Sequence, residues 1–259
     1  NATPYQVTYR FDDFSMRRIS SGFRNFAPFV DVLQYDLSGV DELILVGADR
    51  GARYEVTAAL PYLQIASGIG NDVFAIGSME FGLDSEFLDF KVSIQDAGGK
   101  DILVVNDIGT AGNFNSPTTY SVGYLYSVTD SEVHRQVKEF YFDQFGQSLL
   151  RTFDFRIGFK GFERVELYGG NIDAYYAVSG FNPHGGGGPI FVAVSLGFNT
   201  GKRTTSVSLG DIITGFAAIN GPVDFHARGG TGDWLTIYAS GAFMTGNRLL
   251  NAPVTFENY

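Results

Sequence analysis

The chain of 259 residues contains no cysteine. This absence excludes disulfide frameworks, thiolate metal sites and cysteine nucleophiles. The three histidines, His134, His184 and His226, lie far apart and match no zinc-binding spacing. A Gly-x-Ser-x-Gly motif, the signature of many serine hydrolases, is also missing. The sequence therefore assigns no catalytic residue, and we expect the protein not to be an enzyme.

Positive charge is scarce. The chain has 18 lysines and arginines against 28 aspartates and glutamates, which gives a formal net charge of −10. Binding to nucleic acid requires clustered cations that neutralise phosphates, and no such cluster occurs, so we expect no nucleic-acid partner. No run of 18 apolar residues is present either, so we expect no transmembrane helix.

Glycine and aromatic residues are abundant. The sequence has 33 glycines, 24 phenylalanines and 14 tyrosines, while charged residues make up only 18%. This composition is typical of a β protein that is rich in turns.

The stretch Tyr62–Ser78, YLQIASGIGNDVFAIGS, contains the pattern around which the rest of the chain is organised. Leu63 and Ile65 alternate with more polar neighbours, and Phe74 and Ile76 resume the alternation, as in two half-buried strands. The intervening Gly-Ile-Gly-Asn-Asp favours a tight turn, because glycine accepts positive φ and Asn/Asp side chains bond their own backbone. The stretch matches the G-x-G-x-D-x-U-x form of nonapeptide β-solenoid repeats.

Five further segments show the same order of alternating strand, Gly/Asp/Asn turn and alternating strand. Together with the first they make three units in each half of the chain. They span residues 43–56, 92–105, 165–178, 192–209 and 225–237.

The two halves also resemble each other. Residues 39–58 align without a gap on residues 161–180, and residues 88–107 align on residues 223–240 with a small gap. We interpret this as a tandem duplication. The small, polar segment 108–119 marks the division. The expected units are therefore a first repeat at 1–115, a second at 116–245, and a tail at 246–259 that is either a terminal cap or the start of a further copy.

These patterns predict an all-β protein. We expect a right-handed parallel β-helix, or β-solenoid, of two tandem repeats with Leu, Val, Ile and Phe directed inward. Two β-sandwich domains are the alternative, since alternation does not distinguish coils from hairpins. Residues 131–140 fit a strand, with a helix as the alternative.

Calcium is the one ligand that the turns suggest. This hard cation takes oxygen ligands, and carboxylates from consecutive turns can form an oxygen cage. Ordinary turn-forming Asp and Asn are the other explanation of the pattern. The candidate ligands are Asp72, Asp101, Asp233, Asn71, Asp96 and Asp173.

Exposed aromatic rings can stack on sugars, which makes a cell-surface glycan a second candidate partner. The only tryptophan, Trp234, and the nearby Tyr238 are the rings that could serve. No cluster of rings identifies a sugar site.

The units resemble the Gly/Asp-rich repeats of very large bacterial surface proteins, which are related to the repeats-in-toxin calcium-binding family. The resemblance is carried by VDELILVGADRGARYEV, PYLQIASGIGNDVFAI, DAGGKDILVVND, FERVELYGGNIDAYYAV and RGGTGDWLTIYAS. It covers most of residues 37–107 and 161–240. It implies an extracellular β-solenoid protein, usually accompanied by calcium.

From the repeat pattern and this resemblance we expect a structural subunit of an extracellular bacterial filament, sheath or surface layer. Such a body has open ends with unpaired strands, so copies can self-assemble. A calcium-dependent or glycan-binding adhesin segment is one alternative. A β-helix polysaccharide-degrading enzyme, suggested by fold analogy, is the other.

Overall fold

The structure is a computed structural model. It describes residues 7–12, 15–20, 29–34, 41–47, 49–57, 62–77, 83, 91–108, 119–129, 131–170, 172, 174–179, 191–195, 205–210, 223–227, 234–237 and 254–258. For residues 29, 119–122, 191–195, 205, 226–227, 234–235, 237 and 254–258 the description is restricted to the backbone.

The described residues form strands and turns and contain no helix, so the prediction of an all-β protein is confirmed. One sheet, sheet A, has ten strands. They are β1 (Val7–Phe11), β2 (Ser15–Ser20), β3 (Phe29–Gln34), β5 (Ala52–Val56), β7 (Val73–Gly77), β9 (Ile102–Asn106), β13 (Arg164–Tyr168), β15 (Phe191–Ser195), β17 (Val223–Ala227) and β19 (Val254–Asn258).

The other sheet, sheet B, has nine strands. They are β4 (Leu43–Val46), β6 (Leu63–Ala66), β8 (Lys91–Gln95), β10 (Thr119–Val128), β11 (Glu132–Phe142), β12 (Ser148–Lys160), β14 (Ala174–Val178), β16 (Thr205–Leu209) and β18 (Trp234–Ile237). Residues 132–140 of the segment 131–140 lie in β11, so the helix considered for this segment is wrong.

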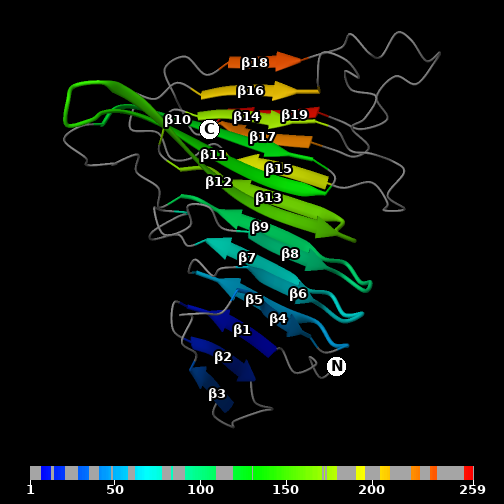
Figure 1. Cartoon of the computed structure of the whole chain (residues 1–259). Coiled ribbons are helices and arrows are strands. Elements are labelled where there is room, and N and C mark those ends of the chain that lie inside the picture. The colour runs from blue at the N-terminus through cyan, green and yellow to red at the C-terminus, as the bar shows by residue number, and fades with distance from the viewer. Residues whose placement is uncertain are drawn as a thin grey trace.

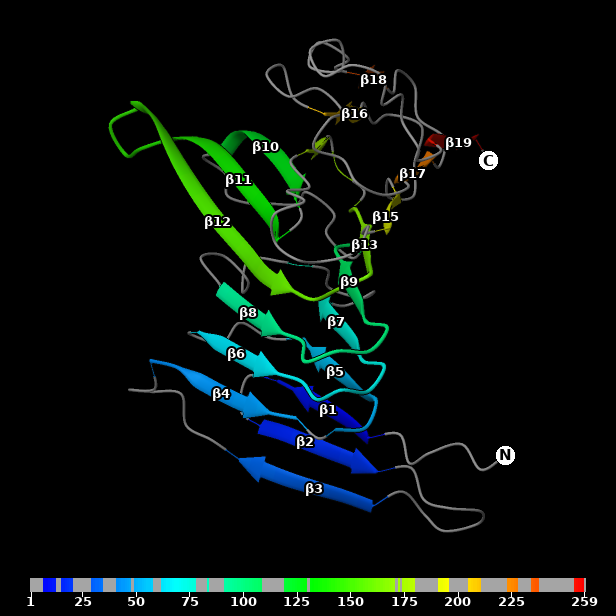
Figure 2. The same ribbon diagram turned by 90° about the vertical axis from the view of Figure 1, so that its right-hand side faces the viewer.

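The strands are stacked along one direction of an elongated molecule (Figure 1). From β4 to β9 and again from β13 to β19 the chain alternates between the sheets, and each strand pairs in parallel with the next strand of its own sheet. The two sheets face each other in the lower part of the molecule, where β4, β6 and β8 lie opposite β5, β7 and β9 (Figure 2). Within the described part of the chain neither sheet closes on itself, and the edge strands are β3 and β19 in sheet A and β4 and β18 in sheet B.

Two antiparallel meanders add to the parallel pairing, one at the end of sheet A and one in the middle of sheet B. β1, β2 and β3 form one in sheet A, and β10, β11 and β12 form the other in sheet B. The hairpin of β11 and β12 is much longer and projects from the stack (Figure 2). In both meanders the first strand pairs in parallel with a later strand, β1 with β5 and β10 with β14.

The alignment of residues 39–58 on 161–180 therefore joins structurally equivalent strands, but on exchanged sheets. β4 lies in sheet B and its aligned partner β13 lies in sheet A, and β5 and β14 are exchanged in the same way. Each copy consists of a meander in one sheet and six single strands that alternate between the sheets, so it contains seven successive segments in alternating sheets. Because seven is odd, the second copy begins on the opposite sheet.

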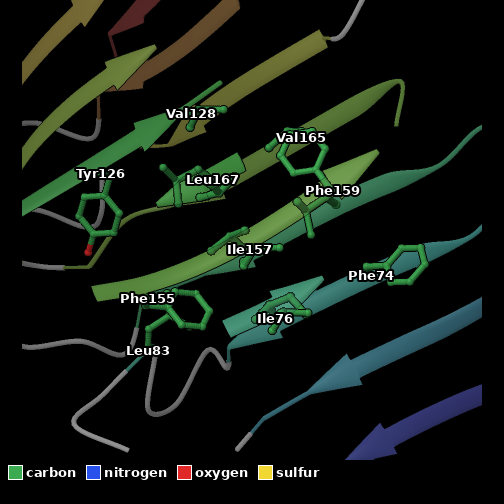
Figure 3. Close-up of a cluster of buried hydrophobic side chains, with 14 of the residues drawn as sticks. Phe74, Ile76, Leu83, Tyr126, Val128, Phe155, Ile157, Phe159, Val165 and Leu167 are labelled. Atoms are coloured by element: carbon green, nitrogen blue, oxygen red, sulfur yellow. The ribbon is translucent and has the colours of Figure 1, made fainter. Parts of the chain in front are cut away.

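Side chains at alternate positions of both sheets fill the space between the sheets. Figure 3 shows part of this cluster, in which sheet B contributes Ile157 and Phe159 and sheet A contributes Phe74, Val165 and Leu167. These side chains are at most 4% exposed. Burial of a side chain of this size stabilises the fold by roughly 1.5–3 kcal/mol, so the core accounts for the inward alternation seen in the sequence.

A glycine–tyrosine contact recurs at equivalent places in the two halves. Tyr54 on β5 stacks between Tyr9 and Phe74, with ring centroids 5.3 and 4.6 Å apart. A Cβ atom at Gly47 would overlap the hydroxyl of Tyr54, and one at the aligned Gly169 would overlap the hydroxyl of Tyr176. Glycine is required at both places because the tyrosine occupies the volume of a side chain.

No helix among the described residues has the length and the apolar character needed to cross a membrane. The predicted division of the chain at 108–119 lies mostly outside the described residues, and the three predicted units stay a prediction. Across this segment both sheets are continuous, because β12 pairs with β8 and β13 with β9.

Candidate metal centre

The turns that lead from sheet B to sheet A lie on top of one another and place the predicted Gly/Asp residues in a stack. A Cβ atom at Gly70 would overlap the backbone of Gly51, and one at Gly99 would overlap the carbonyl of Gly70. Gly99 also has a φ of 150°, which disfavours other residues. The glycines of this motif therefore let successive turns touch, and the aspartates that follow them are brought within reach of each other.

A ladder of carboxylates runs along these turns. Asp72 Oδ1 accepts a hydrogen bond from the backbone N–H of Ala52 at 2.6 Å. Asp101 Oδ1 accepts one from the N–H of Asp72 at 2.6 Å, and Glu163 Oε2 accepts one from the N–H of Asp101 at 2.7 Å. Each acid thus accepts a hydrogen bond from a backbone amide of the preceding turn in the stack. The turn aspartates therefore have a structural role whether or not an ion is bound.

Three of the predicted ligands come together at this ladder. Carboxylate oxygens of Asp72, Asp96 and Asp101 lie within 4.8 Å of one another. Calcium ligands lie 2.3–2.6 Å from the ion, so ligand oxygens on opposite sides of one ion are about 5 Å apart. The three carboxylates are therefore close enough to contact a single cation.

The site is buried and strongly acidic. Asp72 and Asp101 have no exposed surface, and Asp96 is half-buried and accepts a hydrogen bond from Ser67 Oγ at 2.9 Å. Oδ2 of Asp72 and Oδ2 of Asp101 are buried without a hydrogen-bond partner among the described residues. No lysine or arginine of the described residues forms an ion pair with the three acids.

Burial and the neighbouring charges shift the protonation of these acids. Burial raises the pKa of Asp101 to about 7, and the nearby carboxylate of Asp96 adds to the effect. Burial also raises the pKa of Asp72, although the hydrogen bond from Ala52 opposes this shift. Because buried negative charge needs compensation, the site takes up either a proton or a cation.

The other predicted ligands do not join this cluster. Asn71 is exposed, and its Oδ1 accepts a hydrogen bond from the N–H of Lys100 at 2.9 Å, which ties two successive turns together. Asp173 and Asp233 lie outside the described residues. Of the candidate sugar-stacking residues, Tyr238 also lies outside them, and only the backbone of Trp234 is described.

A second buried polar cluster was missed by the sequence analysis. Asp107, which follows β9, and Arg135 on β11 are 0% and 1% exposed, and Arg135 Nε lies 2.9 Å from Asp107 Oδ2. The hydroxyl of Tyr126 also donates to Asp107 Oδ2, and the N–H of Leu83 donates to Oδ1 at 2.6 Å. The arginine also lies over the ring of Tyr124, 5.4 Å from its centroid. This cluster joins the second meander to the first half of the chain.

One sequence signal could have located this cluster. In EVHRQV the residues Val133, Arg135 and Val137 alternate with more polar neighbours, and all three are buried. A charged residue at an inward position predicts a buried partner of opposite charge. The identity of that partner depends on the packing of β11 against β9, which the pattern does not contain.

Of the three histidines, His134 has a described side chain. Its Nε2 lies 2.6 Å from Asp154 Oδ1 across β11 and β12. This hydrogen bond to His134 contributes to a lowered pKa of Asp154, although burial acts in the opposite direction. The pair lies on the outer face of the hairpin.

Comparison of the chain with protein-family models, with curated proteins and with solved structures finds no match.

Proposed function

We propose that this protein is a structural subunit of an extracellular bacterial filament, sheath or surface layer. In this proposal the two sheets are the walls of a right-handed β-solenoid, each pair of strands is one coil, and copies associate through the open ends of the stack. The parallel pairing, the alternation between sheets and the stacked Gly/Asp turns support the solenoid.

The observation that carries the proposal is the apolar character of an uncovered sheet edge. On β4, Ile44 and Val46 point away from the core and are 59% and 75% exposed. At the same outward positions of the next strands the chain has Gln64 and Ala66 on β6, then Ser93 and Gln95 on β8. The outer face of sheet B is thus mainly polar inside the stack and apolar at its edge, as expected for a surface that becomes covered.

The other strand at the same end of the molecule is also exposed. β3 forms the edge of sheet A, and Val30, Val32 and Leu33 are 49%, 56% and 54% exposed. Soluble monomeric proteins usually protect such edges with charges, prolines or bulges. A pair of uncovered apolar edge strands therefore favours an assembling protein over an isolated one.

Light scattering and electron microscopy of the purified chain test the proposal. We expect particles that grow with concentration and elongate along the stacking direction. A chain that stays monomeric at high concentration, both with calcium and with EGTA, would contradict an assembling role.

The acidic cluster supports a second property, calcium dependence. The observation that favours it is that the buried Oδ2 atoms of Asp72 and Asp101 have no hydrogen-bond partner in the part of the chain that the structure describes. Calcium at about 100 times its dissociation constant would stabilise the folded chain by about 2.7 kcal/mol. An unchanged melting temperature on addition of calcium or EGTA would exclude this property. The glycan-binding and polysaccharide-degrading alternatives stay predictions from the sequence.

A further inference from the structure

The internal repeat identifies what the uncovered end of the molecule fits. The free edge strand β3 is the third strand of the first meander, and its equivalent in the second meander is β12. The free edge strand β4 aligns with β13. Within the chain neither β12 nor β13 has a free edge, because β8 covers the first and β9 covers the second.

The exposed fractions of two equivalent residues show how strongly a covering strand affects burial. Leu33 on β3 and Ile157 on β12 have equivalent positions in their meanders. In each meander the last residue of the first strand pairs with a residue of the second strand, and that residue pairs with Leu33 or Ile157. Leu33 is 54% exposed and Ile157 is 0% exposed. The position of Leu33 is thus uncovered in the first meander, whereas the equivalent position in the second meander is buried against the first half of the chain.

The strands that would cover β3 and β4 have equivalents at the other end of the same chain. β8 corresponds to β17 and β9 to β18, by their order after each meander and by the alignment of 88–107 on 223–240. Among the described strands, β18 is the edge strand of sheet B and pairs on one side only, with β16. The molecule therefore carries at one end a strand of the type that covers the edge at its other end.

We infer that β4 of one copy pairs in parallel with β18 of a second copy, so that the chains join head to tail through sheet B. This inference rests on the assembling function proposed above. It reproduces between copies the pairing of β13 with β9 inside the chain. Such a contact is heterologous and leaves a free edge at each end, so it produces an open filament and not a closed dimer.

The register of this contact follows from the internal pairing. Val165 on β13 lies opposite Leu103 on β9. Leu43 aligns with Val165. Leu235 is equivalent to Leu103, because the residue that pairs with Leu235 on β16 is equivalent to the residue that pairs with Leu103 on β7. Leu43 is thus placed opposite Leu235, and the outward residue Ile44 opposite Thr236.

In sheet A the corresponding edge of β17 is occupied within the chain, because β19 pairs with it in parallel. In the middle of the molecule the equivalent edge, that of β8, is occupied by β12. The inferred contact is therefore made in sheet B, where β4 and β18 each have one edge that no described strand covers.

Cysteine cross-linking tests the contact directly, since the chain has no native cysteine. Ile44→Cys and Thr236→Cys are introduced together. Within one chain β4 and β18 are eight strand spacings apart, about 38 Å, whereas a disulfide requires Cα atoms within about 7 Å. Any disulfide between them must therefore join two copies. Under mild oxidation we expect a ladder of covalent dimers, trimers and larger species that disappears with reductant.

The matched control replaces Gln64 on β6, one strand inside the edge, together with Thr236. This control should give no ladder, and a mixture of the two single variants I44C and T236C should give dimers only. If I44C alone forms dimers as readily, the ends meet symmetrically and the inference is wrong. If light scattering shows assembly but the double variant gives no ladder, the inferred contact fails while the assembling function stands. If neither assembly nor cross-linking occurs, both fail.

Discussion

The two meanders of this molecule occupy equivalent places in the repeat but have opposite surroundings. Arg18 on β2 is opposite Tyr9 and Asp31, and Arg135 on β11 is opposite Tyr126 and Phe155. The side chain of Arg18 is 50% exposed and lies 3.7 Å from that of Asp31, whereas Arg135 is buried against Asp107. The same residue at the same position is thus a solvated charge at the end of the stack and a buried ion pair inside it.

Cover by a neighbouring half, and not the local sequence, therefore determines what these strands contribute. Where β8 pairs with β12 and Asp107 binds Arg135, the residues of the second meander contribute to stability. Where the first meander is uncovered, its residues are available for contact. Substitutions in the covered and the uncovered parts of the molecule either separate these two situations or remove the difference between them.

The largest difference is expected between the two arginines. Arg135→Ala leaves Asp107 buried and uncompensated, which should cost about 3–5 kcal/mol of unfolding free energy. Arg18→Ala removes an exposed pair and should change it by less than about 1 kcal/mol. Urea denaturation of the two variants measures both values. Equal losses would mean that the two meanders are equally covered.

The glycine–tyrosine contact should be equally important in both halves. Gly47→Ala and Gly169→Ala each force the neighbouring tyrosine out of its stacked position, at a cost of about 1–3 kcal/mol. Tyr54→Phe removes the overlapping hydroxyl, which makes no hydrogen bond among the described residues. The double variant G47A/Y54F should therefore regain much of the stability lost in G47A. Denaturation curves that show no recovery would refute the overlap as the cause.

The acidic cluster should make the first half sensitive to pH and calcium. Because the pKa of folded Asp101 is about 7, above its ordinary value of 3.8, the folded chain holds a proton that the unfolded chain releases. Without calcium the unfolding free energy should then decrease as the pH rises from about 4 to about 7. Calcium should remove this decrease, since it replaces the proton.

Asp101→Asn keeps an oxygen that accepts the N–H of Asp72 but removes the charge. Its melting temperature should respond less to both pH and calcium than that of the unsubstituted chain. Asp41→Asn, at an exposed position, is the matched control and should leave both responses unchanged. A calcium response that persists in D101N would place the ion elsewhere.

The smallest effect on stability is expected at the uncovered edge. Val46→Lys places a charge at a position that is 75% exposed, so the unfolding free energy should change by no more than about 0.5 kcal/mol. Assembly should nevertheless be weakened, because a lysine on an edge strand opposes pairing with another chain. Light scattering measures this loss. Ala66→Lys, one strand further in, is the control.

The sequence pattern was sufficient for the strands and for part of the site. Alternation predicted the short strands, and the Gly/Asp turns predicted that Asp72 and Asp101 would lie close together, because repeated turns of equal geometry stack. Glu163 was not predicted as the next member of the ladder, since it follows a long hairpin and belongs to no Gly/Asp motif. The exchange of sheets between the halves was also not predictable, because it depends on how many strands each meander adds to one sheet.

Hydrogen exchange of the backbone amides, measured at low and high protein concentration, tests the central claim most directly. The account predicts that amides of β3 and β4 exchange rapidly in dilute solution, while those of β12 and β13 are protected, and that β4 gains protection when copies associate. Protection of β4 in the monomer, or rapid exchange of β4 in the associated material, would contradict the account.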